Sequence, residues 1–117
     1  MTTMARALIT VPKTAKHGEI IEIRALVQHP METGYRRSSE GDLLPRDLIR
    51  RFTCRFVENG KADDTGVIVF AATLHAAIAA NPYLSFNLRA MSSGTLMFSW
   101  EGDNGFSHRE QAALTVA

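Results

Sequence analysis

Apolar and polar residues alternate with a period of two along most of the chain, which is the pattern of half-buried β-strands. The pattern is clearest over residues 20–28, where one side is apolar: Ile21, Ile23, Ala25 and Val27. A second such strand is predicted over residues 50–57, where Phe52, Cys54 and Phe56 share one face. Cys54 therefore lies on the aromatic side of its strand.

Five further stretches have the composition and the punctuation of strands. They cover residues 7–11, 67–71, 84–90, 96–101 and 107–116, and Gly, Pro or Asn stands at their ends. Asp103-Asn104-Gly105 supplies residues that tolerate the positive φ angles of a tight turn between the last two strands. The Ala-rich stretch 73–80, which stops before Asn81-Pro82, predicts a helical turn or short helix.

Seven short strands in a chain of 117 residues predict one all-β domain over residues 1–117, an immunoglobulin-like antiparallel β-sandwich with one long loop. The composition agrees, because 45% of the residues are hydrophobic and 21% are charged, as in ordinary soluble domains. The Cys-Trp-Cys signature of antibody domains is absent, since the chain has a single cysteine. The pattern predicts the architecture and not membership of the antibody family.

The long loop, predicted over residues 29–49, is the most informative segment. Loops of about twenty residues inside a compact domain are usually functional or disordered. This one carries Met31, Tyr35 and the stretch Leu43-Leu44-Pro45, which are too apolar for a solvated linker. We interpret it as a docking surface. Its arginines, with those that follow it, either form a basic patch for an acidic partner or are ordinary solvated charges: Arg36, Arg37, Arg46, Arg50 and Arg51.

The sequence offers no assembled chemistry. Its formal charge of +1 is too small for a nucleic-acid-binding field, and no apolar run is long enough for a transmembrane helix. The four histidines are scattered without zinc-ligand spacing, and no Gly-x-Ser-x-Gly elbow occurs. We therefore expect neither an enzyme nor a cofactor, metal, nucleic-acid or membrane partner. The first eleven residues lack the apolar core of a signal peptide, so no export signal of its own is expected.

Cys54 has two interpretations. An unpaired cysteine in an oxidising compartment can form an intermolecular disulfide with a partner. Free cysteine is also among the most buried residue types, and Cys54 then packs beside Phe52 and Phe56. We favour the second interpretation.

Several blocks of sequence resemble the SoxZ family, which supplies the Z subunit of the SoxYZ carrier of bacterial thiosulfate oxidation. The most specific block is His29-Pro30-Met31-Glu32-Thr33-Gly34-Tyr35-Arg36. Others, in the same order as in the family, are Ala5-Arg6-Ala7-Leu8-Ile9, Gly18-Glu19-Ile20-Ile21-Glu22-Ile23, Pro45-Arg46-Asp47, Phe52-Thr53-Cys54, residues 78–86 and Ser93-Gly94-Thr95-Leu96. The weakest agreement covers residues 58–70.

The resemblance implies an immunoglobulin-like subunit that binds a SoxY-like partner, in a heterodimer or a higher assembly. Sulfur intermediates are carried on a cysteine in a flexible C-terminal arm of that partner, and other Sox enzymes act on them there. The resemblance also implies a periplasmic location, reached by export together with the Y subunit. From their residue types we expect five side chains to contact the partner: Met31, Tyr35, Arg36, Tyr83 and Phe86. For Phe86 a place in the core is the alternative.

An alternative belongs to another class of protein. The chain is then a stand-alone adhesion or ligand-binding sandwich that uses the 29–49 loop for recognition. Whether the isolated chain associates with itself through a vacant partner face stays open at this point.

Overall fold

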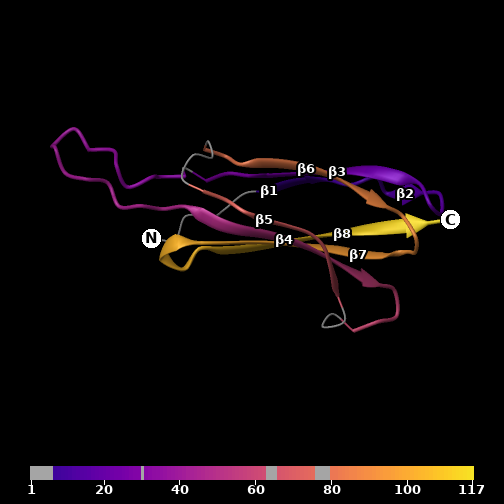
Figure 1. The fold of residues 1–117 in the computed structure, drawn as a ribbon. Coiled ribbons are helices and arrows are strands. Elements are labelled where there is room, and N and C mark those ends of the chain that lie inside the picture. The colour runs from indigo at the N-terminus through magenta and orange to yellow at the C-terminus, as the bar shows by residue number, and fades with distance from the viewer. Residues whose placement is uncertain (1–6, 30, 63–65, 76–79) are drawn as a thin grey trace.

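The computed structural model describes residues 7–29, 31–62, 66–75 and 80–117, and it is built almost entirely from strands in two layers (Figure 1). The elements are β1 (Ala7–Thr10), β2 (Thr14–Ala15), β3 (Ile20–Val27), β4 (Ile49–Glu58), β5 (Val67–Thr73), β6 (Tyr83–Arg89), β7 (Gly94–Gly102), a 3-10 turn η2 (Asp103–Gly105) and β8 (Ser107–Val116).

One sheet has the strand order β1-β3-β6 and the other β2-β8-β7-β4-β5. The pairs are antiparallel except that of β2 with β8, which is parallel. This arrangement confirms the predicted immunoglobulin-like sandwich. The seven predicted strands are all present, with ends that differ by at most two residues.

The interior lies between the inner faces of the two sheets. The period-two pattern of β3 is confirmed, because Ile21, Ile23, Ala25 and Val27 are buried. In the opposite sheet Phe52 is fully buried and contacts four rings, the nearest being that of Trp100 at 5.2 Å between centroids. Phe70 and Phe86 stack between the sheets with centroids 4.3 Å apart. Aromatic packing of this kind stabilises beyond the area that it buries.

Two local features differ from the sequence prediction. The strand β2 was missed, because two residues carry no detectable period. In the predicted helical stretch 73–80, Thr73 ends strand β5 and Leu74 and His75 are not helical, while residues 76–79 lie outside the described part of the chain. Pairing with β4 decides the conformation of Thr73 against the weak local helix preference.

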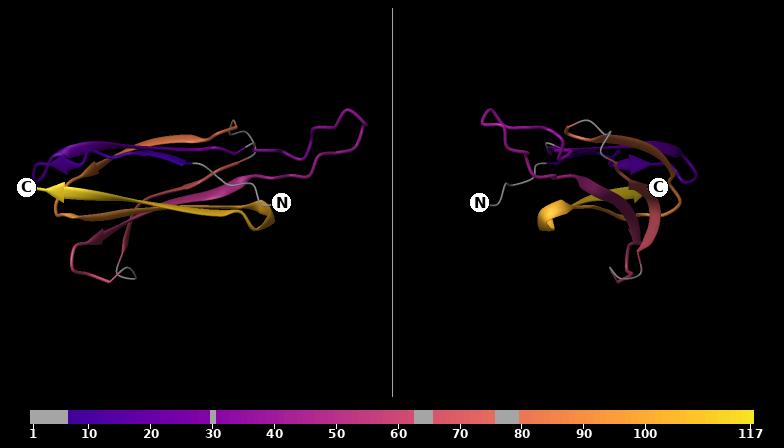
Figure 2. Two further views of the ribbon diagram at one scale, coloured as in Figure 1. Left: turned by 180° about the vertical axis from the view of Figure 1, so that it is seen from behind. Right: turned by 60° about the vertical axis from the view of Figure 1, so that its left-hand side comes forward.

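The predicted turn at residues 103–105 is confirmed. Asn104 has φ of 58° and Gly105 has φ of 75°, the left-handed values for which these two residue types are suited. The turn lies at the same end of the sandwich as the long loop, and the C-terminus lies at the other end (Figure 2). The molecule is elongated, with principal extents of 58 × 25 × 20 Å.

Candidate partner-binding surface

The long loop, residues 28–48, is folded back on itself and projects from the end of the sandwich (Figure 1). Glu32 and Asp47 exchange two backbone hydrogen bonds of 2.8 Å, and Arg37 pairs with Leu43 nearer the tip. These antiparallel bridges give the loop a defined path that ordinary linkers lack. The prediction of a long loop over residues 29–49 is therefore confirmed in position, although its base and middle are ordered by backbone pairing.

Gly34 shows why the two limbs of the loop come so close. Its φ is 90°, which is a glycine conformation, and a Cβ atom built there would lie 3.0 Å from the Cβ of Arg46 in the opposite limb. Any other residue at this position would have to adopt an unfavourable positive φ and would also crowd the side chain of Arg46.

His29 anchors the first limb to the body of the protein. Its side chain is buried, and its Nδ1 accepts a 3.0 Å hydrogen bond from the backbone N–H of Met31. Because Nδ1 is an acceptor, the proton of the neutral ring is on Nε2, which lies 3.4 Å from the Oδ1 of Asp47. The backbone N–H of His29 donates to the Oδ1 of Asn81 at 2.9 Å, and the backbone N–H of Asn81 donates to the carbonyl of His29 at 2.7 Å. The histidine thus acts as a structural clamp.

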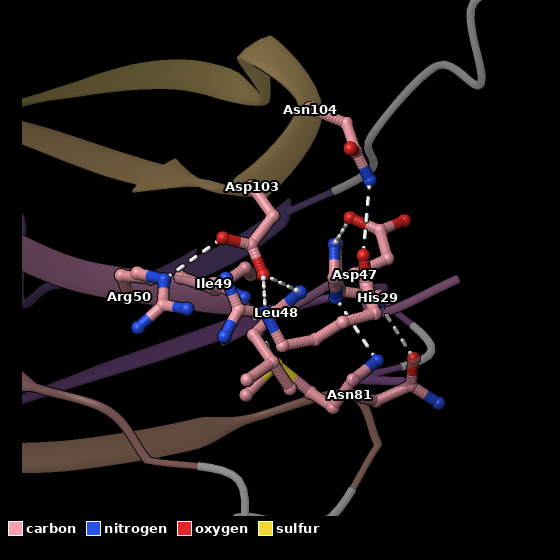
Figure 3. Close-up of polar contacts among 10 residues, drawn as sticks. His29, Asp47, Leu48, Ile49, Arg50, Asn81, Asp103 and Asn104 are labelled. Carbon is pink, nitrogen blue, oxygen red and sulfur yellow. Dashed lines mark hydrogen bonds and ion pairs between the residues drawn. The ribbon is translucent and has the colours of Figure 1, made fainter. Parts of the chain in front are cut away.

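Asp103, in the turn after β7, fixes the second limb (Figure 3). Its Oδ2 accepts 3.1 Å hydrogen bonds from the Nε of Arg46 and the backbone N–H of Leu48, and its Oδ1 accepts one of 2.8 Å from the Nε of Arg50. The hydrogen bond from Arg50 is the main reason that the pKa of the Asp103 carboxyl lies below its ordinary value of 3.8. A carboxylate 55 residues away in sequence therefore holds the end of the loop.

Three of the five predicted contact residues lie on the surface. Tyr35 is 85% exposed near the middle of the long loop. Arg36 is also exposed and forms a 2.7 Å ion pair with Glu32, which orients its guanidinium along the loop. Tyr83, at the start of β6, is 56% exposed. These positions are available to a partner, and their role in binding stays a prediction.

The other two predicted contact residues, Met31 and Phe86, are buried and belong to the core. Met31 takes a φ of 52°, which turns its side chain inward so that its sulfur accepts a hydrogen bond from the N–H of Ile49 at 3.3 Å. Phe86 stacks on Phe70. Met31 is therefore not an exposed anchor, and Phe86 takes the core position that was its alternative.

An apolar row that the sequence analysis missed joins the surface near the loop. Leu8 pairs with Leu26, and Leu26 pairs with Tyr83, so the three side chains stand in line on the outer face of the smaller sheet. Leu8 is 64% exposed. The sequence did contain an indication of this row, because Leu8 and Leu26 are apolar residues at the strand positions that alternate with the buried ones.

Cys54 is fully buried between the sheets, opposite Phe70 on β5 and Phe98 on β7. Burial raises the pKa of its thiol to about 12. The thiolate is the nucleophilic form of cysteine, so both the raised pKa and the burial of this thiol disfavour reaction at neutral pH. The packing interpretation of Cys54 fits the structure, whereas an intermolecular disulfide at Cys54 requires the core to open.

The described residues hold no group of three or more His, Cys, Asp or Glu side chains that could bind a metal ion. They also contain no helix that is both long enough and apolar enough to cross a membrane.

Comparison with solved structures finds the same fold in other proteins. A superoxide reductase (neelaredoxin) variant from Ignicoccus hospitalis matches with a TM-score of 0.75 and 20% identity, over 95% of this chain and 79% of the other. A putative superoxide reductase from Thermotoga maritima matches with a TM-score of 0.68 and 16% identity, over 95% and 85%. The sulfur carrier protein SoxY from Chlorobium limicola f thiosulfatophilum matches with a TM-score of 0.62 and 12% identity, over 95% and 78%. At these identities the likeness shows a shared fold.

Comparison with protein families is more specific. No curated protein matches the chain significantly. The family model described as sulphur oxidation protein SoxZ matches residues 9–113, which is nearly the whole chain and includes the long loop and the strands β3 and β4 that flank it. The chain therefore belongs to the SoxZ family.

Proposed function

We propose that this chain is the non-catalytic subunit of a SoxYZ-type carrier, and that it binds and stabilises a Y subunit. In this proposal the C-terminal cysteine arm of the Y subunit carries the sulfur intermediates of thiosulfate oxidation. The family assignment supports a place in this system, and the SoxY match adds that the fold also occurs in a sulfur carrier.

The observation that carries the proposal is the position of Cys54. It is the only cysteine of the chain, it is fully buried, and its thiol pKa is about 12. A covalent sulfur intermediate needs an accessible thiolate. This supports our inference that the sulfur is carried by another polypeptide and that this chain contributes binding.

The surface offers suitable features for such binding. Interfaces are enriched in aromatic residues, methionine and arginine, with apolar residues at the centre. Tyr35 and Arg36 on the ordered loop, and the row of Leu8, Leu26 and Tyr83, provide these residue types around one end of the sandwich. His29 and Asp103 hold the loop in place, so little conformational entropy is lost when a partner binds.

The proposal includes a periplasmic location, reached by export together with the Y subunit, and indirect contact with other Sox enzymes through the carried arm. Fractionation of cells that express both chains tests the location. The chain should be found in the periplasm when the Y subunit has its export signal and in the cytoplasm when that signal is deleted. Periplasmic chain in the absence of an exported Y subunit contradicts export as a complex.

The binding proposal is tested by co-expression with the cognate Y subunit, followed by size-exclusion chromatography and mass determination. We expect a stable complex that contains both chains, and no thiosulfate oxidation by the 117-residue chain alone. Separate elution of the two chains, or turnover by the isolated chain, contradicts the proposal.

A further inference from the structure

Strand β5 is an edge strand of unusual composition. The two sheets end in four edge strands, which are β1 and β6 in one sheet and β2 and β5 in the other. β1 and β2 have four residues and two, and β6 carries Arg89 and Asn87. β5 has seven residues, Val-Ile-Val-Phe-Ala-Ala-Thr, without a charge, a proline or a glycine. Short length, charge and proline are the usual protections of an edge.

The hydrogen-bond phase of the β4–β5 pair shows which backbone groups point outward. The N–H of Leu74 donates to the carbonyl of Arg50, the residue opposite it, at 2.8 Å. Hydrogen-bonded and non-bonded pairs alternate in an antiparallel ladder, so the next bonded pair is Phe52 with Ala72. The N–H and C=O groups of Ala71 and Thr73 therefore point away from β4, toward the outer edge. A bulge at Val69 is the one irregularity of this strand.

Two large apolar side chains of β5 are exposed in the isolated chain, as expected if another strand covers this edge. Val67 is 65% exposed and Ile68 is 43% exposed. The first four residues of β5, Val67 to Phe70, have high β-propensity, and the strand has no charge and no proline, which makes an open edge prone to aggregation. An edge of this kind is compatible with a soluble protein when another strand covers it.

Charged residues on the outer face of the larger sheet indicate what kind of strand would cover the β5 edge. Arg51 lies opposite Thr73 and Arg55 lies opposite Ile68. With Arg109 they line a depression on the outer face of the larger sheet, which also includes Glu101 and Glu110. Glu110 is engaged by His108 at 2.9 Å, and within the described part of the chain neither Arg55 nor Arg109 forms an ion pair. A second copy of this chain would bring the same arginines toward this edge, whereas a partner with acidic residues would pair with them.

We propose that β5 receives an extended strand of the Y subunit, which pairs with the outward backbone groups of Ala71 and Thr73 and turns acidic side chains toward Arg51 and Arg55. This inference rests on the proposed function. The SoxY match shows that a sulfur carrier can have the same sandwich fold, and we infer that the Y subunit offers an edge strand of its own. Two like sandwiches joined through equivalent edges are related by a pseudo-twofold axis, which makes the joined strands antiparallel. The larger sheet then continues across the interface, as in other cases of strand addition.

The test measures binding of Y by four forms of the chain: the parent, Ala71→Pro, Ala71→Ser and Asn87→Pro. Proline at position 71 removes an outward N–H and leaves the bonds to β4 in place. Serine at the same position keeps the N–H. Asn87 is the matched position on β6, the edge strand of the smaller sheet. The N–H of Val27 bonds to the carbonyl of Pro82 opposite it, so alternation along the β3–β6 pair turns the N–H and C=O of Asn87 away from β3. We expect Ala71→Pro to weaken binding about tenfold or more, and the other two variants to bind like the parent.

Residue-resolved amide exchange tests the same contact without a mutation. The amides of Ala71 and Thr73 should exchange rapidly in the isolated chain and slowly in the complex, whereas that of Ala72, bonded to β4, should be slow in both. Arg55→Glu should also weaken binding, and Arg55→Lys should retain most of it.

The outcomes separate this inference from the proposed function. If the parent does not bind Y, the proposed function fails and the inference with it. If the parent binds while folded Ala71→Pro binds equally well, or the Ala71 and Thr73 amides stay unprotected, the inference is overturned and the proposed function stands. A homodimer that Ala71→Pro dissociates, with Y bound equally by both forms, assigns the edge to a second copy and also overturns the inference.

Discussion

The interior of the sandwich and the long loop obtain their structure in different ways. Around Phe52 the chain is ordered by apolar side chains that recur every second residue, so neighbours in sequence already indicate the buried face. The loop is ordered by single polar contacts between distant residues, such as Asp103 with Leu48 and Asn81 with His29. The comparison teaches that stability resides in a redundant apolar layer, whereas the shape of the proposed binding surface depends on a few individual groups.

Phe52→Ala should give the largest effect. The ring is fully buried and contacts Phe70, Phe86, Phe98 and Trp100, so its removal leaves a cavity. We expect a loss of about 3–5 kcal/mol in the free energy of unfolding, measured by urea denaturation. Tyr35→Ala is the matched control on an exposed aromatic residue, and its change should stay within about 0.5 kcal/mol. Equal losses for the two variants would remove the distinction between core and loop.

Cys54→Ser should give a smaller loss of stability than Phe52→Ala. It places a hydroxyl in an apolar site between Phe70 and Phe98, at a cost of about 1–3 kcal/mol in the free energy of unfolding. Cys54→Ala is the control, since it adds no polar group.

The thiol itself offers a second measurement at this position. In the folded parent the Cys54 thiol should react with a thiol reagent only as fast as the protein opens, because burial keeps it protonated and covered. Reaction in the native state at the rate of a model thiol would contradict the placement of Cys54 in the core.

Asp103→Asn should loosen the loop while the sandwich stays folded. The pKa of Asp103 is lower in the folded chain than its ordinary 3.8, so the ionised carboxylate stabilises the fold. That contribution is complete above about pH 5 and is lost as the pH falls through 3.8 to the folded-state pKa. The melting temperature of the parent should therefore fall more steeply than that of Asp103→Asn between pH 5 and about pH 3. Parallel profiles for the two proteins would exclude Asp103 as the source of this pH dependence.

Tyr35→Ala should have the smallest effect on stability and a clear effect on the proposed binding. The side chain is 85% exposed, so its loss costs the isolated chain little. Binding of the cognate Y subunit, measured by isothermal titration, should weaken about tenfold if Tyr35 is an anchor at the interface. Ser39→Ala, at an exposed position nearer the tip of the same loop, is the control. Unchanged affinity for Tyr35→Ala removes the loop from the proposed interface.

The same comparison explains what could be predicted from the sequence. The strands at residues 20–27 and 49–58 follow from period-two alternation, and the turn at Asn104-Gly105 follows from residues that accept a positive φ. Leu84, Phe86 and Leu88 recur every second residue, and this period correctly indicates that Phe86 faces the core. The period is a better guide here than the general enrichment of aromatic residues at interfaces.

The remaining features depend on contacts between segments far apart in the chain. The burial of Met31 requires a positive φ and a hydrogen bond to Ile49, and neither is indicated by a local pattern. The Asp103 carboxylate reaches the loop across more than fifty residues. The sequence shows Leu8 and Leu26 at outward-facing positions, but their alignment with Tyr83 in one row depends on the register of β1, β3 and β6, which no local pattern indicates.

The central claim is that this chain binds the carrier and does not itself carry sulfur. Its most direct test is intact-mass measurement of both chains in the complex, isolated without reductant from cells that are oxidising thiosulfate. We predict sulfur adducts that a reductant removes on the Y subunit, and an unmodified mass for the 117-residue chain. A sulfur adduct on Cys54 would contradict the account.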